Sequence, residues 1–281
     1  MRSMFKDHLD FLKQHRKIII ANYDDLIFGN TEIAMESSAV KNKTMMVDEA
    51  IKAFQSNLEA LQLFDRVVVS TEPLASMVRL FNPDADVQVS PNFLPNSMIA
   101  LHKELSFHER FRYNNTIGYF AGTLSHNRDF PIVEPVLHRI LMENPELNLI
   151  VVGPVKLPRS LSALPNVTVT GVRPFQQLPG LMAACSTAIA PLENSTFNRC
   201  KSRVKFLEAA LTGVRLVSSP IPDMQAIGEP HLILADTHDD WYSALSEPPV
   251  FAAFRPQAKT NFDRIAMGQD VSGFEILGNL A

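Results

Sequence analysis

The sequence predicts an α/β protein with parallel sheets that carry helices on both faces. Short runs rich in β-branched residues alternate with longer stretches of helical periodicity along most of the chain. This alternation is typical of βα units, whose strands assemble into a parallel sheet between two layers of helices. The chain has 281 residues, 46% of them hydrophobic and 20% charged, a balance typical of a globular protein with room for two domains.

The first part of the chain contains the first of these units. Lys-Ile-Ile-Ile-Ala and Arg-Val-Val-Val-Ser are β-branched runs that predict strands, and Pro73 stands where a helix begins. We expect an amphipathic helix within 1–17, strands at 17–21, 66–70 and 87–90, and helices at 44–63 and 73–81. Residues 95–115 carry charged side chains and no strong period, so we place a domain boundary near residue 106.

The second part of the chain repeats the pattern more clearly, and its turns are marked by Gly and Pro. We expect strands at 116–120, 149–152, 167–170, 187–190, 214–218 and 232–235. Helices are expected at 132–142, 176–184, 223–227 and 239–245, with a further one that runs from Lys201 through Glu208. The predicted domains are therefore 1–106 and 107–281, with functional loops at the carboxyl ends of the strands.

Composition and charge exclude several classes of function. The net charge is −4 and no long basic run is present, which argues against nucleic-acid binding. Cys185 and Cys200 form neither a disulfide framework nor a zinc-binding spacing, so we expect no metal site and a reduced, cytoplasmic setting. No apolar run is long enough for a transmembrane helix, and residues 1–17 lack the core of a secretion signal. Peripheral contact of this mildly basic end with the inner face of a membrane stays open.

A first candidate motif, Gly-Tyr-Phe-Ala-Gly-Thr-Leu-Ser-His-Asn-Arg-Asp-Phe, spans 118–130. Gly122 lets a ligand approach the backbone, Thr123 offers a hydroxyl and an N–H, and Arg128 can form paired bonds to phosphate oxygens. The simpler interpretation is a βα turn in which Asp129 caps the next helix and His126 is an ordinary surface histidine.

A second candidate motif lies in 191–213, directly after the expected strand at 187–190. On a continuous helix, Lys201, Lys205 and Glu208 fall within about 60° of one another. Two ammonium groups and a carboxylate suit a diphosphate and a sugar diol at a helix that follows a sheet strand. The simpler interpretation is a solvated helix face with an ion pair between Lys205 and Glu208.

Together these motifs carry a resemblance to a known family. The run Gly-Tyr-Phe-Ala-Gly-Thr…His-Asn-Arg-Asp-Phe, then Val-Val-Gly-Pro, then Ala-Pro-Leu-Glu…Phe-Asn-Arg…Lys-Ser…Lys-Phe-Leu-Glu-Ala resembles the donor domain of retaining GT-B glycosyltransferases of the group 1 family. The branch is that of bacterial surface-polysaccharide (O-antigen or capsule-type) transferases, and the likeness covers about residues 116–245. Asp24-Asp25, Phe64–Thr71 and the Pro91-Asn92 turn are similar to the acceptor-side domain of that branch and to the turn between its domains.

The resemblance implies α/β architecture with two Rossmann-like domains of GT-B type, an acceptor-side domain and a domain that binds a nucleoside diphosphate sugar, with no metal and no cofactor. Glu208 matches the glutamate that binds the donor ribose, and Arg128 with Lys201 matches the basic pair that neutralises the diphosphate and serves catalysis. The other implied donor contacts are Gly122, Thr123, His126, Asn198, Ser202 and Lys205.

Two departures from the family pattern stand out. Many relatives place a sugar-contacting glutamate eight residues before the ribose-binding one, and here that position is Cys200. Glu193 could replace it, although it reads more simply as a solvated loop residue. The amino-terminal domain is also short, so we expect it to be incomplete. An upstream segment, a partner chain that completes it, or a lost part of the acceptor site would each account for this.

Asp24-Asp25 follows the first expected strand, where a carboxylate could orient an acceptor hydroxyl or simply cap a helix. The function expected is retaining transfer of a hexosyl or deoxyhexosyl unit from a nucleoside diphosphate sugar to a glycan or lipid-linked acceptor in polysaccharide biosynthesis. The alternative is a non-catalytic module that keeps the fold and acts as partner or scaffold of another transferase.

Overall fold

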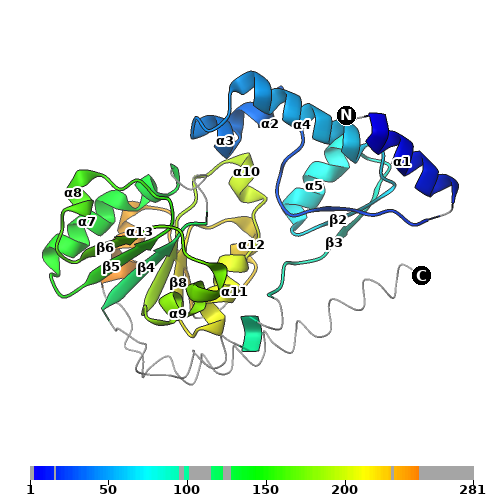
Figure 1. Ribbon diagram of the computed structural model, residues 1–281. Coiled ribbons are helices and arrows are strands. Elements are labelled where there is room, and N and C mark those ends of the chain that lie inside the picture. Colours follow the sequence, from blue (N-terminus) through cyan, green and yellow to red (C-terminus); the bar gives the residue numbers. More distant parts are fainter. Residues whose placement is uncertain are drawn as a thin grey trace. The chain divides into compact units, whose positions relative to one another are not determined.

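The computed structural model of the protein describes residues 3–15, 17–94, 98–100, 115–122, 128–228 and 231–246 (Figure 1). The chain divides into two compact units. Unit 1 takes the described residues up to Asn92 together with Asn194–Ser202, and unit 2 takes those of Phe93–Glu193 and from Arg203 onward. The boundary expected near residue 106 lies outside the described residues. The sequence assigns Asn194–Ser202 to the second domain, whereas the structure packs this segment into unit 1.

Unit 1 is built on a three-stranded parallel sheet in the order β1-β2-β3. The strands are β1 (Ala21–Tyr23), β2 (Arg66–Val69) and β3 (Asp86–Val89), and the helices are α1 (Ser3–Gln14), α2 (Thr31–Glu36), α3 (Ser38–Lys41), α4 (Val47–Leu61), α5 (Glu72–Phe81) and α10 (Thr196–Arg199). Side-chain caps begin three of the helices, α2, α5 and α10. Asn30 accepts a hydrogen bond from the Ile33 amide at the start of α2, and Thr71 accepts one from the Leu74 amide at the start of α5.

The strand expected at 17–21 is wrong in its position. β1 begins only at Ala21, which pairs with Val67, and the preceding isoleucines are not part of the sheet. In this register Ile18 and Ile19 would lie opposite residues that precede β2, which begins only at Arg66, so these two isoleucines have no partner strand in the described part of the chain. Ile18 is accordingly exposed.

Unit 2 is built on a six-stranded parallel sheet in the order β6-β5-β4-β7-β8-β9. Its strands are β4 (Thr116–Phe120), β5 (Asn148–Val152), β6 (Val167–Thr170), β7 (Thr187–Ala190), β8 (Arg215–Ser218) and β9 (Leu232–Leu234). Counted within the unit, this is the order 3-2-1-4-5-6 of Rossmann domains, in which the direction of winding reverses between β4 and β7. Ligands of such sheets bind at that reversal, beyond the carboxyl ends of the strands.

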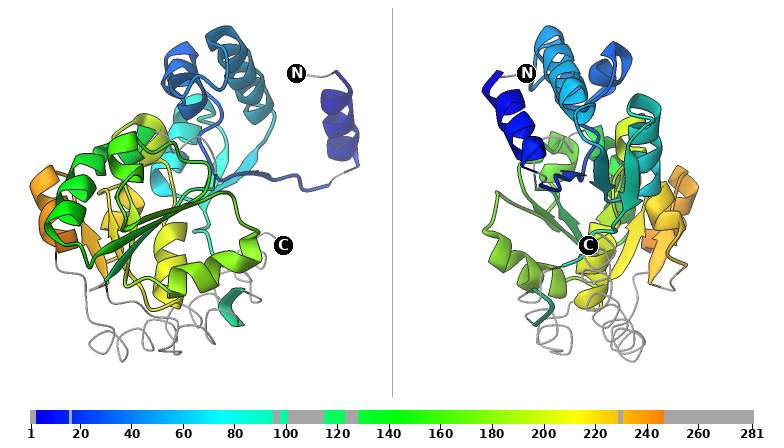
Figure 2. Two further views of the ribbon diagram at one scale, coloured as in Figure 1. Left: turned by 60° about the vertical axis from the view of Figure 1, so that its left-hand side comes forward. Right: turned by 90° about the vertical axis from the view of Figure 1, so that its right-hand side faces the viewer.

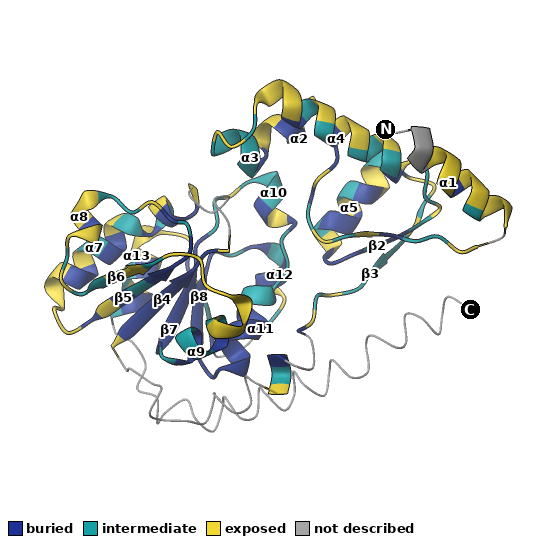
Figure 3. Cartoon of the chain, in the orientation of Figure 1, coloured by how far each residue is buried: buried dark blue, intermediate teal, exposed yellow. Residues whose placement is uncertain are grey.

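Helices cover both faces of this sheet, so unit 2 has three layers (Figure 2). The helical elements are η3 (Phe130–Ile132), α7 (Glu134–Glu143), α8 (Arg159–Ser162), η4 (Phe175–Gln177), α9 (Leu178–Ala183), α11 (Val204–Leu211), α12 (Pro222–Gln225) and α13 (His238–Ser246). One core joins the sheet to α7, α8 and α13, and the other joins it to α9, α11 and α12. Strands β4, β7 and β8 are buried along their whole length, as expected for the centre of a parallel sheet with helices on both faces (Figure 3).

Among the helices that the structure describes, none combines the length and the apolar character needed to cross a bilayer.

Candidate functional site

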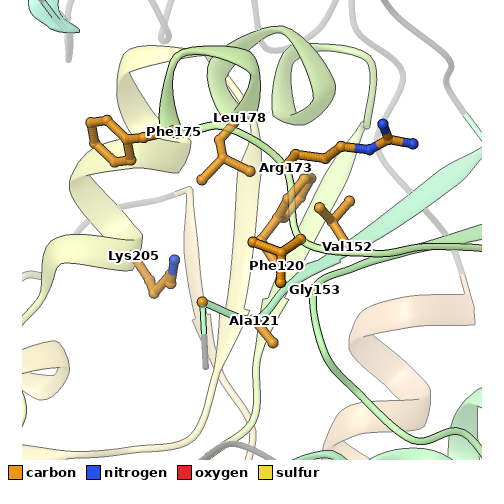
Figure 4. Close-up of a pocket in the computed structure, with 10 residues that line it drawn as sticks. Phe120, Ala121, Val152, Gly153, Arg173, Phe175, Leu178 and Lys205 are labelled. Atoms are coloured by element: carbon orange, nitrogen blue, oxygen red, sulfur yellow. The ribbon is translucent and has the colours of Figure 1, made fainter. Parts of the chain in front are cut away.

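An open pocket of about 200 Å³ lies in unit 2 where β4 and β5 end (Figure 4). Ala121 and Gly122 follow β4, Gly153 follows β5, and Lys205 comes from the first turn of α11. The rest of the lining is mostly apolar and consists of Phe120, Val152, Val172, Arg173, Phe175 and Leu178. The pocket therefore occupies the sheet edge at which Rossmann-type units bind their ligands.

Two glycines shape this edge in different ways. Gly153 has φ +120°, and a Cβ at this residue would lie 1.9 Å from the carbonyl oxygen of Ala121, so only glycine lets the ends of β4 and β5 come together. At Gly122 an added Cβ would meet no atom within 4 Å. Packing therefore does not require a glycine at residue 122. Gly122 lines the pocket, and the space that its missing side chain leaves open is part of that pocket.

Lys205 and Glu208 form an ion pair of 3.0 Å between Nζ and Oε2. The solvated helix face considered from the sequence is not what the structure contains, because the Glu208 side chain is only 10% exposed. Burial of a carboxylate is unfavourable without partners, and Lys205 provides one. In Figure 4 the Lys205 ammonium faces the space beside Leu178 and Ala121. The pair thus places a cation at the pocket and a buried carboxylate directly behind it.

Lys201 does not share a helix with Lys205 and Glu208, so the expected single helix is wrong. α10 ends at Arg199 and α11 begins at Val204, and Lys201 lies in the link between them. The new helix starts where the Asp223 carboxylate accepts a hydrogen bond from the Arg203 amide, at 2.7 Å, and pairs with the Arg203 guanidinium. This contact fixes the backbone just before α11 and separates the two helices.

Lys201 belongs to unit 1, where it has its own partners. Its Nζ lies 3.6 Å from Oδ1 of Asp25 and 4.7 Å from the centre of the Phe197 ring. Asp25 therefore pairs with a cation and does not cap a helix, since α2 is capped by Asn30.

Asn198 and Ser202 also belong to unit 1. Asn198 is buried in α10, and its backbone amide bonds the Ser195 hydroxyl that caps this helix. The Ser202 hydroxyl accepts a hydrogen bond of 2.8 Å from the side-chain amide of Asn92, which also donates to the Asp24 carboxylate. The expected donor contacts are therefore divided. Gly122 and Lys205 line the pocket of unit 2, and Glu208 is paired with Lys205, whereas Asn198, Lys201 and Ser202 belong to unit 1.

Arg128 lies in unit 2 and bonds Glu193 through two nitrogens, Nε to Oε2 at 3.2 Å and Nη2 to Oε1 at 2.9 Å. This contact raises the pKa of Arg128 above its usual value. Glu193 is therefore neither a simple solvated residue nor a free carboxylate. Asp129 makes no side-chain cap to the next helix, and its carboxylate instead accepts a bond from the Glu193 amide. Thr123 and His126 lie outside the described residues.

Cys200, at the position of the missing glutamate, is buried in the core of unit 1. Thr71 donates its hydroxyl proton to the carbonyl oxygen of Cys200 at 2.8 Å. Burial raises the pKa of the Cys200 thiol to about 11, with a further contribution from the nearby Asp25 carboxylate. Packing therefore explains this residue, and the segment around it is tied firmly to unit 1.

Sequence reasoning missed the contribution of the loop after β6. Val172, Arg173 and Phe175 line the pocket, and the Arg173 Nε donates to the Thr170 hydroxyl at 2.8 Å. In Figure 4 the Arg173 guanidinium points away from Lys205 and Leu178, so mainly its stem faces the pocket. A signal was present, because Val-Arg-Pro-Phe comes just beyond a strand of the same parallel sheet and therefore reaches the same edge.

Comparisons with known proteins agree with this architecture. Residues 115–247 match the family model described as "Glycosyl transferases group 1". No curated protein sequence matches the chain.

Three solved structures illustrate the likeness in fold. The Anabaena protein HepE in complex with UDP and glucose is 15% identical, with 97% of this chain and 74% of that chain covered at a TM-score of 0.58. WaaG, a glycosyltransferase involved in lipopolysaccharide biosynthesis, is 15% identical, with 95% of this chain and 78% of that chain covered at a TM-score of 0.63. The α,α-trehalose-phosphate synthase (UDP-forming) of Burkholderia vietnamiensis is 10% identical, with 97% of this chain and 71% of that chain covered at a TM-score of 0.66.

Identities this low support a shared fold and nothing further. The family match covers the segment that contains the pocket. Residues 115–247 thus resemble the group 1 glycosyl transferases, within a chain that shares the GT-B fold of these structures.

Proposed function

We propose that this protein transfers a hexosyl or deoxyhexosyl unit from a nucleoside diphosphate sugar to a glycan or lipid-linked acceptor, with retention of configuration. The single observation that carries the proposal is the pocket of unit 2, which Lys205 and two glycines line at the carboxyl edge of a Rossmann-type sheet, with the buried Glu208 paired to that lysine. HepE was solved with UDP and glucose, and WaaG is a glycosyltransferase, which supports the choice of donor and reaction.

In this proposal Glu208 accepts hydrogen bonds from the ribose hydroxyls of the donor. A buried carboxylate suits this role, because hydrogen bonds to a charged acceptor are stronger when water is excluded. Lys205 fixes the position of the carboxylate through the 3.0 Å ion pair and brings positive charge to the pocket. The apolar lining, with Phe175 and Leu178, offers a surface for the nucleobase.

The chemical step depends on the charge that develops on the departing nucleoside diphosphate. Fixed cations stabilise that charge in the transition state more than in the ground state, which lowers the barrier. We assign this role to Arg128 and Lys201, with Lys205 in support. Side chains rather than a metal ion then neutralise the diphosphate, so EDTA leaves turnover unchanged.

Calorimetry with UDP-, GDP-, ADP- and dTDP-sugars tests the proposal. We expect one of these donors to bind, and we expect Glu208→Gln to weaken binding at least tenfold, because the substitution removes the charge but keeps the shape. Glu146→Gln is the matched control, since Glu146 is an exposed residue of the same unit. An NMR assay of the sugar product then reports whether the anomeric configuration is retained.

The results separate the proposed enzyme from a non-catalytic module. Donor binding that depends on Glu208, followed by turnover with an acceptor, supports the transferase. If no donor of the panel binds and Glu208→Gln changes nothing, the assignment of the site is wrong.

A further inference from the structure

The Arg128 guanidinium is bonded to a carboxylate of the protein itself, that of Glu193. Its Nε and Nη2 both bond the carboxylate of Glu193, at 3.2 and 2.9 Å, in the paired geometry by which guanidinium groups also bind phosphate. Glu193 lies in the loop that follows β7, and Arg128 lies in the segment between β4 and η3. The pair therefore links the chain beyond the two strands between which the sheet reverses its winding. This is the sheet edge at which a diphosphate is proposed to bind.

The Glu193 side chain is held in this position by its backbone. The buried carboxylate of Asp129, the residue next to Arg128, accepts a hydrogen bond of 2.9 Å from the Glu193 amide. Neighbouring residues of one loop therefore hold Glu193 at two points, by its side chain and by its main chain. The Glu193 side chain is 28% exposed and that of Arg128 is 48% exposed, so an anion from solvent can reach the pair.

We propose that Glu193 is an internal competitor that occupies Arg128 until the diphosphate of the nucleotide displaces it. The inference rests on the proposed function, because it takes Arg128 as a diphosphate contact. Guanidinium nitrogens that bond a carboxylate in the paired geometry are not free for a phosphate, so one anion replaces the other.

This exchange makes Glu193 a residue that sets the affinity for the nucleotide. When the nucleoside diphosphate leaves, Glu193 returns to Arg128, so the cation is never left without a partner. Release of the product becomes easier by the free energy of the restored ion pair. An exposed or half-exposed pair changes affinity by about two- to fivefold.

The test is a double-mutant cycle measured by calorimetry. The proteins are the wild type, Glu193→Gln, Arg128→Met and the double variant, and the probes are the nucleoside diphosphate panel and inorganic pyrophosphate. Glu193→Gln keeps the shape and the main-chain bond to Asp129 but removes the competing charge. Glu143→Gln is the matched control, because Glu143 forms an exposed ion pair with Arg139 at 2.9 Å through one nitrogen. The pair lies at the end of α7 that leads into the start of β5, and so away from the carboxyl edge of the sheet.

We expect Glu193→Gln to tighten binding of the diphosphate two- to fivefold, Arg128→Met to weaken it, and Glu193→Gln to have no effect once Arg128 is absent. Glu143→Gln leaves the affinity unchanged. If Arg128→Met weakens binding but Glu193→Gln does not tighten it, the competitor role is refuted while the proposed function stands. If pyrophosphate alone binds and responds to both residues, the competitor role stands and the nucleotide-sugar function fails. If neither probe binds, both are refuted.

Discussion

At Cys200 a thiol stands where the resemblance to group 1 glycosyltransferases leads us to expect a carboxylate. The residue is 2% exposed and packs in the core of unit 1, where burial raises the pKa of the thiol to about 11. An apolar environment that disfavours a thiolate disfavours a carboxylate as well. The absence of the glutamate from this position therefore follows from the packing of the segment that carries it.

Cys200→Glu is expected to lower the free energy of unfolding by about 3–5 kcal/mol, because it buries a carboxylate in a core that provides no ion pair for it. Cys200→Ala removes only the sulfur atom and is expected to cost about 1 kcal/mol. Denaturant unfolding followed by circular dichroism measures both. Equal stabilities for the two variants would show that residue 200 is not held in the core.

The two pocket glycines predict opposite effects of the same substitution. Gly153→Ala puts a Cβ against the Ala121 carbonyl at a positive φ, so we expect a loss of at least about 2 kcal/mol of stability. Gly122→Ala meets no atom and is expected to change stability by less than about 0.5 kcal/mol. Gly122→Ala should instead weaken binding of the nucleoside diphosphate about three- to tenfold, because the added methyl group occupies space in the pocket. Thermal unfolding and calorimetry distinguish the two effects, and normal binding by Gly122→Ala would place the ligand elsewhere.

At the scale of elements, the segment Asn194–Ser202 has the most unusual position. It follows a central strand of unit 2 in the sequence, yet α10 and the residues around it pack into unit 1. Thr71 is one anchor of this segment, since its hydroxyl donates to the Cys200 carbonyl and accepts from the Leu74 amide. One side chain thus caps α5 and ties down the segment.

Thr71→Val keeps the shape of the residue and removes both bonds, so we expect a loss of about 2–4 kcal/mol from a missing cap and a buried carbonyl without its donor. Thr71→Ser keeps the hydroxyl and should lose about 1 kcal/mol or less. Denaturant unfolding compares the two variants. Equal losses would mean that the methyl group, and not the hydroxyl, is what matters at residue 71.

Elements whose limits are set by local sequence could be predicted, and elements whose limits are set by distant contacts could not. β4 and β7 have the predicted bounds, because a strand inside a parallel sheet is marked by a continuous β-branched or apolar run. β1 and the split between α10 and α11 could not be predicted in this way. Their limits are set by contacts distant in the sequence, the pairing of Ala21 with Val67 and the bond of Arg203 to Asp223.

At the scale of the whole molecule, two observations meet at one edge of unit 2. The strand order reverses between β4 and β7, and the pocket with Lys205 lies beside the end of β4. The sequence predicted Gly122 and Lys205 at this edge, since βα order alone brings the residues that follow successive strands together. Phe175 and the pairing of Arg128 with Glu193 depend on side-chain packing between loops, which no periodic pattern records.

A crystal structure with the best-binding nucleoside diphosphate tests the central claim most directly. We predict that the nucleotide occupies the pocket of unit 2, with its ribose hydroxyls within hydrogen-bonding distance of the Glu208 carboxylate and its diphosphate beside Gly122. A nucleotide bound at another place, with the Lys205–Glu208 pair untouched, would contradict the account.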